Sequence, residues 1–287
     1  MKRFLPCVAL FLIAFPARAQ IQVDLKFKRL QYIAYEPVIA TVTITNLAGR
    51  DIELHDDNDQ HWFGFEVTAN EGRTLGPLLQ IPEPPLQIAA GTSVTRKIDL
   101  GKRFPVSDLG VYHVRPNVFF ADLKKYFYAR AKVFEVTTAR PIWQQTVGVP
   151  SGNGERTYAL MTNRFSDHTS LYVRVQDKAR GLVYSTYSLG RLISFDEPHA
   201  EIDRDNQLHV LQCSAPRLWA YSVVGLDGKL LKHVSYVQTR SSPRLRRMAD
   251  GSVIVAGGTL DVPVVPARTG KAAPKLSDRP ADLPPED

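Results

Sequence analysis

Apolar and polar residues alternate at every second position over much of the first half of this chain, and this period constrains the fold more than any other feature. A period of two places successive side chains on opposite faces of a β-strand, whereas an amphipathic helix repeats every 3.6 residues. Turn-forming residues separate the alternating segments. We therefore predict an all-β chain that begins with a β-sandwich. The clearest segments are residues 22–27, 38–45, 93–100 and 129–136.

One local motif makes the prediction for the first half more specific. Residues 108–114, Asp-Leu-Gly-Val-Tyr-His-Val, resemble the tyrosine corner of immunoglobulin-like domains, in which a tyrosine hydroxyl turns back to the backbone. The resemblance is to disulfide-free bacterial domains of secreted proteins, including macroglobulin-type and proteinase-inhibitor-type sandwiches. It implies that Val114, Val42 and Ile44 pack where antibody-type domains have a disulfide. Such domains serve adhesion, spacing, inhibition and ligand binding, so the resemblance implies a fold rather than an activity.

The second half contains an internal repeat, in which short apolar strands and Gly-containing turns recur in the same order. A third copy begins with the turn at residues 250–255, which matches residues 205–210. The other aligned segments are 171–175 with 208–212 and 182–185 with 219–222, at an offset of 37 residues, and 188–193 with 226–231 at an offset of 38.

A period of about 40 residues is typical of propeller blades. The pattern Asp-Asn-Gln-Leu-His-Val, followed by Trp-Ala-Tyr and Leu-Asp-Gly-Lys-Leu, is similar to blades of the NHL or YVTN type. About two and a half units fit in this part of the chain, whereas closed propellers have about four blades or more. We therefore expect a second β domain that is either an open β-meander or a partial propeller.

The chain begins with a pattern typical of a secretory signal peptide. Lys2 and Arg3 precede an apolar run, and a small-x-small site ends at Ala19. The run is about a dozen residues long, too short to cross a hydrocarbon layer of about 30 Å as a helix. We expect cleavage after Ala19, a secreted or periplasmic location and no transmembrane segment after signal removal. Cys213 would then be the single thiol of the mature chain, and its apolar strand context predicts burial.

Composition suggests the order of the domains. We expect the signal peptide at 1–19, the immunoglobulin-like sandwich at 20–138, a linker at 139–155, the repeat-containing β domain at 156–262 and a disordered Pro-rich tail at 263–287. Of the net charge of +7, three charges lie in the signal peptide and four in the second β domain. Neither aromatic interleaving nor a recognition helix accompanies these charges, so we expect no nucleic-acid partner.

Two surfaces are candidates for binding. Tyr126 and Tyr128 follow Lys124 and Lys125, and aromatic rings beside polar groups can stack on sugars or anchor peptides. A second, basic cluster could bind an anionic polysaccharide, phospholipid headgroups or an acidic partner, although the composition favours a solvated loop. Its members are Arg240, Arg244, Arg246 and Arg247.

The densest polar cluster is the stretch 55–61, His-Asp-Asp-Asn-Asp-Gln-His. Asp56, Asp57 and Asp59 could hold a divalent cation, but their spacing matches no EF-hand or known zinc motif. Turn chemistry in a loop between strands explains the same residues, and we expect no cofactor.

Familiar catalytic motifs are missing from the sequence, which favours a non-enzymatic protein. We therefore expect an exported interaction or scaffolding protein whose partner is a protein or glycan of the cell envelope. One alternative is a secreted hydrolase with a site between the two domains, to which Asp203, Asp205 and His199 would contribute. Another is a proteinase-inhibitor-like module that presents the loop 78–86, stiffened by three prolines.

Overall fold

The computed structural model describes residues 20–150, 152, 154–193 and 195–261. Within these residues the chain is all-β, as the alternation predicts, and the remaining regular structure is three short 3-10 turns. The predicted signal peptide and the predicted tail at 263–287 lie outside the described residues. In the part that is described, no helix has the length and apolar character needed to span a bilayer.

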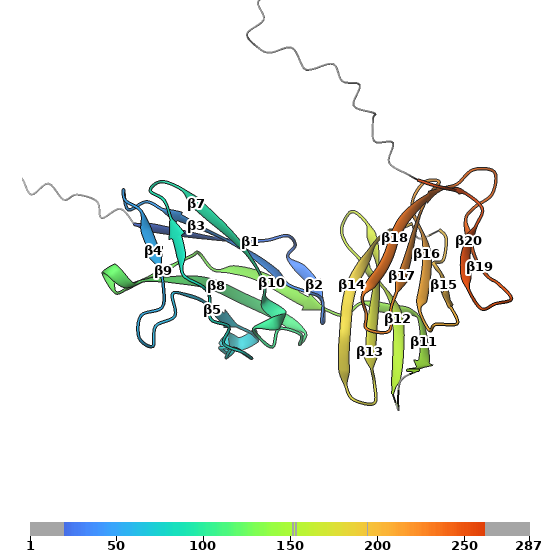
Figure 1. The fold of residues 1–287 in the computed structure, drawn as a ribbon, viewed down its shortest axis with the longest axis horizontal. Coiled ribbons are helices and arrows are strands. Elements are labelled where there is room, and N and C mark those ends of the chain that lie inside the picture. Colours follow the sequence, from blue (N-terminus) through green and yellow to red (C-terminus); the bar gives the residue numbers. More distant parts are fainter. Residues whose placement is uncertain (1–19, 151, 153, 194, 262–287) are drawn as a thin grey trace, which may run out of the picture.

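The first ten strands, which we call the N-terminal sandwich, form two larger sheets that face each other and a two-stranded sheet of β4 and β6 (Figure 1). One sheet has the order β1-β3-β7, and the other has the order β2-β10-β8-β5, with β9 also paired to β8. All these pairs are antiparallel except β2 with β10. The strands are β1 (Ile21–Phe27), β2 (Gln31–Ile33), β3 (Ile39–Asn46), β4 (Ile52–Leu54), β5 (Phe63–Thr68), β6 (Leu86–Ile88), β7 (Ser93–Asp99), β8 (Gly110–Phe120), β9 (Lys125–Tyr128) and β10 (Lys132–Thr137).

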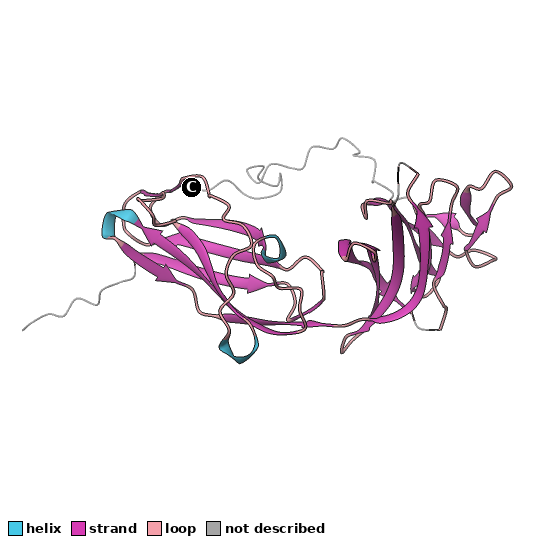
Figure 2. Cartoon of the chain, turned by 90° about the horizontal axis from the view of Figure 1, so that it is seen from below, coloured by secondary structure: helices cyan, strands magenta, loops and turns pink. Residues whose placement is uncertain are grey.

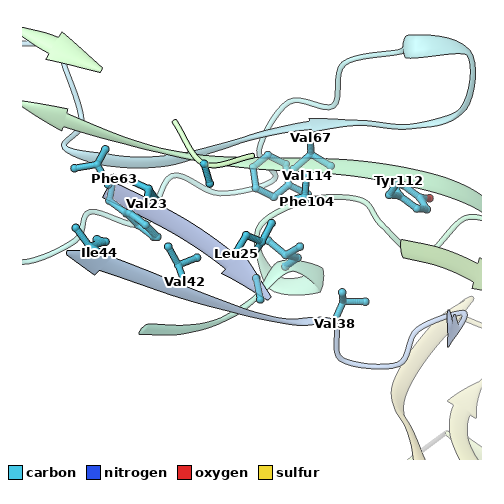
Figure 3. Packing of buried hydrophobic residues seen from close by; sticks show 14 of the residues in the cluster. Val23, Leu25, Val38, Val42, Ile44, Phe63, Val67, Phe104, Tyr112 and Val114 are labelled. Carbon is cyan, nitrogen blue, oxygen red and sulfur yellow. The ribbon is translucent and has the colours of Figure 1, made fainter. Parts of the chain in front are cut away.

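Alternation builds the core of the sandwich, because every second side chain of β1 and β3 points between the sheets. Val42, Ile44 and Val114 are fully buried in one cluster, which Figure 3 shows from close by. The expected corner contact is also present, since the Tyr112 hydroxyl donates to the Asp108 carbonyl at 2.7 Å. The Tyr112 ring stacks on Phe134 with centroids 5.1 Å apart.

The remaining strands, which we call the C-terminal sheets, form two antiparallel meanders in chain order, β11-β12-β13-β14 and β15-β16-β17-β18, with β21 beside β18 and a hairpin of β19 and β20. The two meanders share one apolar cluster that includes Leu160, Val173 and Val210. The strands are β11 (Arg140–Gly148), β12 (Glu155–Arg164), β13 (Thr169–Asp177), β14 (Leu182–Leu192), β15 (His199–Ile202), β16 (Leu208–Ala215), β17 (Leu218–Val224), β18 (Leu230–Val237), β19 (Arg244–Arg247), β20 (Val253–Ala256) and β21 (Thr259–Leu260).

Much of the predicted linker at 139–155 is a strand. β11 pairs with β12 over its whole length, with one irregularity between Pro141 and Trp143. Two features allow this pairing in spite of the proline and glycine content. β11 is an edge strand, where a proline costs no ladder hydrogen bond if its nitrogen faces outward. Pro150 and Gly154 then fall in the turn that follows.

The repeat has a different register from the one that the sequence suggests. Residues 171–175 lie in β13, the third strand of its meander, whereas residues 208–212 lie in β16, the second strand. A period-two pattern is common to all strands and does not show where a strand lies within its sheet. The sequence alignment therefore matched β13 with β16, which occupy different places in their meanders. The turns before β16 and β20 are closed alike, since the Asp203 N–H donates to the Gln207 carbonyl and the Met248 N–H donates to the Ser252 carbonyl.

The N-terminal sandwich contacts the C-terminal sheets through β2 and the turn after it. Ile33 packs with Met161 and Tyr172 in a small buried cluster. Beside it, Arg29 donates to the Tyr172 hydroxyl at 2.8 Å, and Arg174 donates to the Ala34 carbonyl at 2.6 Å. Figure 2 shows the two groups of strands on either side of this junction.

Candidate functional site: a cleft beside strand β5

A cleft of about 260 Å³ lies beside β5 in the N-terminal sandwich. Segments that are distant in the sequence meet there: the acidic loop 55–61, β5 itself, the segment 75–83 and Tyr126 of β9. The cleft therefore gathers one of the predicted tyrosines, two of the predicted aspartates and most of the predicted proline-rich loop. The sequence placed these features in separate candidates.

The acidic loop is held in shape by its own hydrogen bonds. One carboxylate oxygen of Asp56 accepts the Trp62 N–H at 2.9 Å, and the other lies 2.9 Å from Nδ1 of His61. Burial alone would raise the pKa of Asp56, but the hydrogen bonds from Trp62 and His61 bring it below its ordinary value. The hydrogen bond to Asp56 raises the pKa of His61. Both pKa shifts favour an ion pair between a deprotonated Asp56 and a protonated His61.

The predicted metal site at Asp56, Asp57 and Asp59 is not formed. Across the described ranges, no group of three or more His, Cys, Asp and Glu side chains is arranged to hold a metal ion. The reason is that Asp56 caps the start of β5, while Asp57 accepts a hydrogen bond from the Asn58 side chain at 3.0 Å. Backbone bonds between Asp57 and Gln60 close the turn, which agrees with the turn interpretation.

The proline-rich loop 78–86 is anchored at Glu83. The Trp62 ring N–H donates to the Glu83 carbonyl at 3.1 Å, and Arg96 and Arg103 both form ion pairs with the Glu83 carboxylate. Arg96 also lies over the Trp62 ring, 5.1 Å from its centroid. The loop before this anchor is exposed, with Leu78 and Leu79 each 62% accessible.

Aromatic rings form much of the cleft wall. Phe63 and Phe65 of β5 make an edge contact with centroids 5.2 Å apart, and Phe65 makes another with Phe104 at 6.4 Å. Tyr126 also lines the cleft, and its hydroxyl donates to the Gln60 side chain. Its neighbour Tyr128 is exposed and carries Arg115 over its ring, 4.2 Å from the centroid. The predicted tyrosine pair is thus on one face of β9.

The two lysines of the same prediction lie apart from the cleft that Tyr126 lines. Lys124 ends the preceding 3-10 turn in a left-handed conformation, with φ of 48°. Lys125 places its ammonium group 5.8 Å from the centroid of Phe127, and neither lysine lines the cleft. The alternation of β9 explains this, since Lys125 and Phe127 share the face opposite Tyr126.

The predicted basic cluster lies elsewhere. Arg244, Arg246 and Arg247 belong to β19, and Arg240 lies in the loop before it; all four side chains are exposed. Leu245 between them packs into the apolar cluster of the second meander. None of the four arginines lines the cleft.

The residues proposed for a hydrolase are also separated. Asp203 bonds to His209 rather than to His199, with Nε2 of His209 at 2.9 Å, and its other oxygen accepts the N–H groups of Asp205 and Gln207. The opposite ring nitrogen of His209 lies 2.7 Å from the Tyr221 hydroxyl. Burial raises the pKa of Tyr221 to about 12. This buried network holds the turn before β16.

Sequence reasoning missed Gly64, Phe104 and Asn117 as parts of the cleft. Gly64 was a usable signal, because a glycine inside a strand often marks a close approach of other groups. A Cβ atom at this position would lie 3.0 Å from the Asn117 side-chain oxygen. Phe104 gave no signal, since its place in the cleft depends on a contact between segments distant in sequence.

Comparisons with known proteins add little to this description. No family model matches the chain, and no curated protein matches it. Among solved structures, the sporulation control protein Spo0M from Bacillus subtilis is similar with a TM-score of 0.28 and 10% sequence identity, over 57% of this chain and 83% of that chain. A likeness at this level carries no argument about fold or function.

Proposed function

We propose that this chain is an exported, non-enzymatic interaction or scaffolding protein of the cell envelope that binds a protein or glycan in the cleft beside β5. The signal-peptide pattern of residues 1–19 supports export. Immunoglobulin-like character of the N-terminal sandwich and blade-like character of the C-terminal sheets belong to the same proposal. The observation that carries it is the convergence on one cleft of aromatic and polar groups from segments that are distant in the sequence.

Binding explains the cleft better than catalysis does, because two of its carboxylates, Asp56 and Glu83, are already engaged. Asp56 is shared between His61 and the backbone of Trp62. Glu83 is held by two arginines with less than a fifth of each side chain exposed. A general acid or base must be free to exchange a proton with a substrate. The engaged carboxylates of Asp56 and Glu83 therefore hold the walls of the cleft in place rather than transfer protons.

The proposal is tested by filling the cleft and measuring retention of envelope components. Gly64 lines the cleft, has no positive φ, and meets first the end of the flexible Asn117 side chain. Gly64→Leu therefore adds a side chain to the cleft at modest cost. Gly148→Leu is the matched control, since nothing lies within 4 Å of the Cβ position there and the backbone is again without a positive φ.

The measurement is a pull-down from solubilised envelope fractions with the mature chain, residues 20–287, at physiological salt. We expect the wild type and Gly148→Leu to retain the same protein or glycan, and Gly64→Leu to lose it. Circular dichroism of all three proteins checks that they are folded. Equal retention by folded Gly64→Leu, or specific retention of nothing by the wild type, would contradict the proposal.

A further inference from the structure

The cleft has one wall made of backbone groups that no strand pairs with. β5 is the last strand of its sheet, so β8 lies along one of its edges and the cleft along the other. Successive residues of an antiparallel strand direct their N–H and C=O groups to opposite edges. Two hydrogen bonds of known direction therefore fix the orientation of every peptide group in β5.

The first bond marks the edge that faces β8. The Phe119 N–H donates to the Trp62 carbonyl at 2.8 Å, which pairs Trp62 with β8. Gly64 and Glu66 follow at steps of two, and their partners in the register are Asn117 and Arg115. The amides of Gly64 and Glu66 thus belong to the ladder between β5 and β8.

The second bond marks the edge that faces the cleft. The Val67 carbonyl accepts the Leu75 N–H at 2.8 Å, on the side away from β8. Phe63 and Phe65 precede Val67 at steps of two and so face the same way. In the described residues, no backbone hydrogen bond reaches the N–H or C=O groups of Phe63 or Phe65. Free groups of this kind are a template for an added strand.

The other wall of the cleft forms no backbone hydrogen bond with this edge among the described residues. After the contact of Leu75 with the edge of β5, the chain turns away, and residues 77–83 line the cleft. Pro77 and Pro82 in this segment have no N–H group. Between them, Leu79 and Ile81 line the cleft and are 62% and 42% exposed. The wall therefore offers apolar side chains to a bound segment, and its two prolines lower its own capacity to pair as a strand.

The acidic loop adds an unpaired carboxylate to the cleft. Asp56 and Asp59 line it, and Asp59 is exposed and forms no ion pair among the described side chains. Glu83 is already neutralised by Arg96 and Arg103. A ligand with a positive charge at this end would complement Asp59.

We propose that the cleft binds an extended segment of a partner protein as an added strand on β5. This inference rests on the proposed function and specifies its ligand. The segment hydrogen-bonds to Phe63 and Phe65, places apolar side chains at alternate positions against Leu79 and Ile81, and carries a lysine or arginine near Asp59. Backbone bonds supply affinity in this mode, and the alternating side chains supply specificity.

The probe is a library of random peptides displayed on phage, selected against immobilised wild-type protein and counter-selected against Gly64→Leu. We expect enriched peptides with alternating apolar residues and a basic residue toward one end. Amide hydrogen exchange is then measured by NMR with and without a selected peptide. Binding should slow exchange at Phe63 and Phe65 about tenfold, the effect of one net hydrogen bond, and leave Gly64 and Glu66 unchanged.

A second measurement uses the peptide backbone. N-methylation at the positions that face β5 should weaken binding about tenfold, whereas methylation at the intervening positions should not. Selected peptides that leave Phe63 and Phe65 unchanged, or the absence of any enrichment, would overturn the inference. If the pull-down still retains an envelope protein or glycan in that case, the proposed function stands without the added strand. If nothing is retained either, both fail.

Discussion

At the scale of single residues, the features that follow from the sequence are those whose partners are close in the chain. Tyr112 reaches a carbonyl only four residues upstream, so the motif around it predicts the contact that is observed. The loop 55–61 likewise closes on itself through neighbouring residues. Asp203 is an exception, because its partner His209 is only six residues away and the sequence analysis grouped Asp203 with His199 instead.

Replacing Tyr112 by phenylalanine isolates the corner hydrogen bond. The ring is retained and can still stack on Phe134, while the Asp108 carbonyl loses its donor. We expect a loss of about 1 kcal/mol in the free energy of unfolding, the usual net contribution of one hydrogen bond. Urea denaturation of both proteins measures it. An unchanged midpoint with an unchanged slope would show that the corner contributes nothing.

The pair of Asp56 and His61 makes a prediction about pH. His61 has a pKa above its ordinary 6.5, so its contribution to stability is present below 6.5 and is lost as the pH rises through the raised pKa. Asp56 has a lowered pKa, so its contribution is present above its ordinary 3.8 and is lost as the pH falls through the lowered pKa. The charged pair therefore exists between the lowered pKa of Asp56 and the raised pKa of His61.

NMR titration of the His61 ring checks this directly. Asp56→Asn should bring the pKa of His61 back toward 6.5, because it removes the carboxylate that is the main cause of the shift. Identical His61 curves in the two proteins would contradict the assignment.

At the scale of elements, alternation predicts that strands exist and which face is buried, but not which strands are neighbours. It placed β1, β3 and β7 correctly, and it also aligned β13 with β16, which occupy different places in their meanders. The cleft depends on neighbours: β5 is its wall because it is an edge strand, and the segment 75–83 faces it because Glu83 is anchored to β7 through Arg96. Neither relation is visible in a periodic pattern.

Removing the charge of Glu83 should release the loop that forms the far wall. Glu83→Gln leaves Arg96 and Arg103 without their carboxylate while all three side chains are mostly buried. We expect a loss of about 2 kcal/mol in stability and faster proteolysis within residues 78–81. Glu66→Gln is the control, because its pair with Arg115 is 3.6 Å long and about half exposed. Equal cleavage rates in the two variants would refute the anchoring role.

At the scale of the whole molecule, the sequence predicted two β-rich parts but gave no sign of how they touch. The junction is polar as well as apolar: Arg29 bridges Tyr172 and Glu36, while Arg174 reaches from β13 to a backbone carbonyl beyond β2. Arginines are common on protein surfaces, so such partners cannot be assigned from one sequence. The geometry indicates that the junction positions the N-terminal sandwich on the C-terminal sheets.

Arg174→Met tests this role. The substitution removes the hydrogen bonds to Ala34 and Thr186 but keeps an unbranched side chain of similar length. We expect both parts to remain folded and their relative orientation to vary more, which small-angle X-ray scattering detects as a broader distribution of long distances. Arg115→Met, on the exposed face of β8, is the control. A scattering curve identical to that of the wild type would show that the junction does not depend on Arg174.

The measurement that tests the account most directly is amide hydrogen exchange along β5 in the unliganded protein. If the edge of β5 is open to the cleft, the amides of Phe63 and Phe65 exchange fast, while those of Gly64 and Glu66, bonded to β8, exchange slowly. The alternation within one strand controls for local stability. Slow exchange at Phe63 and Phe65, equal to that of their neighbours, would mean that the edge is already covered and that the cleft has no template for a partner strand.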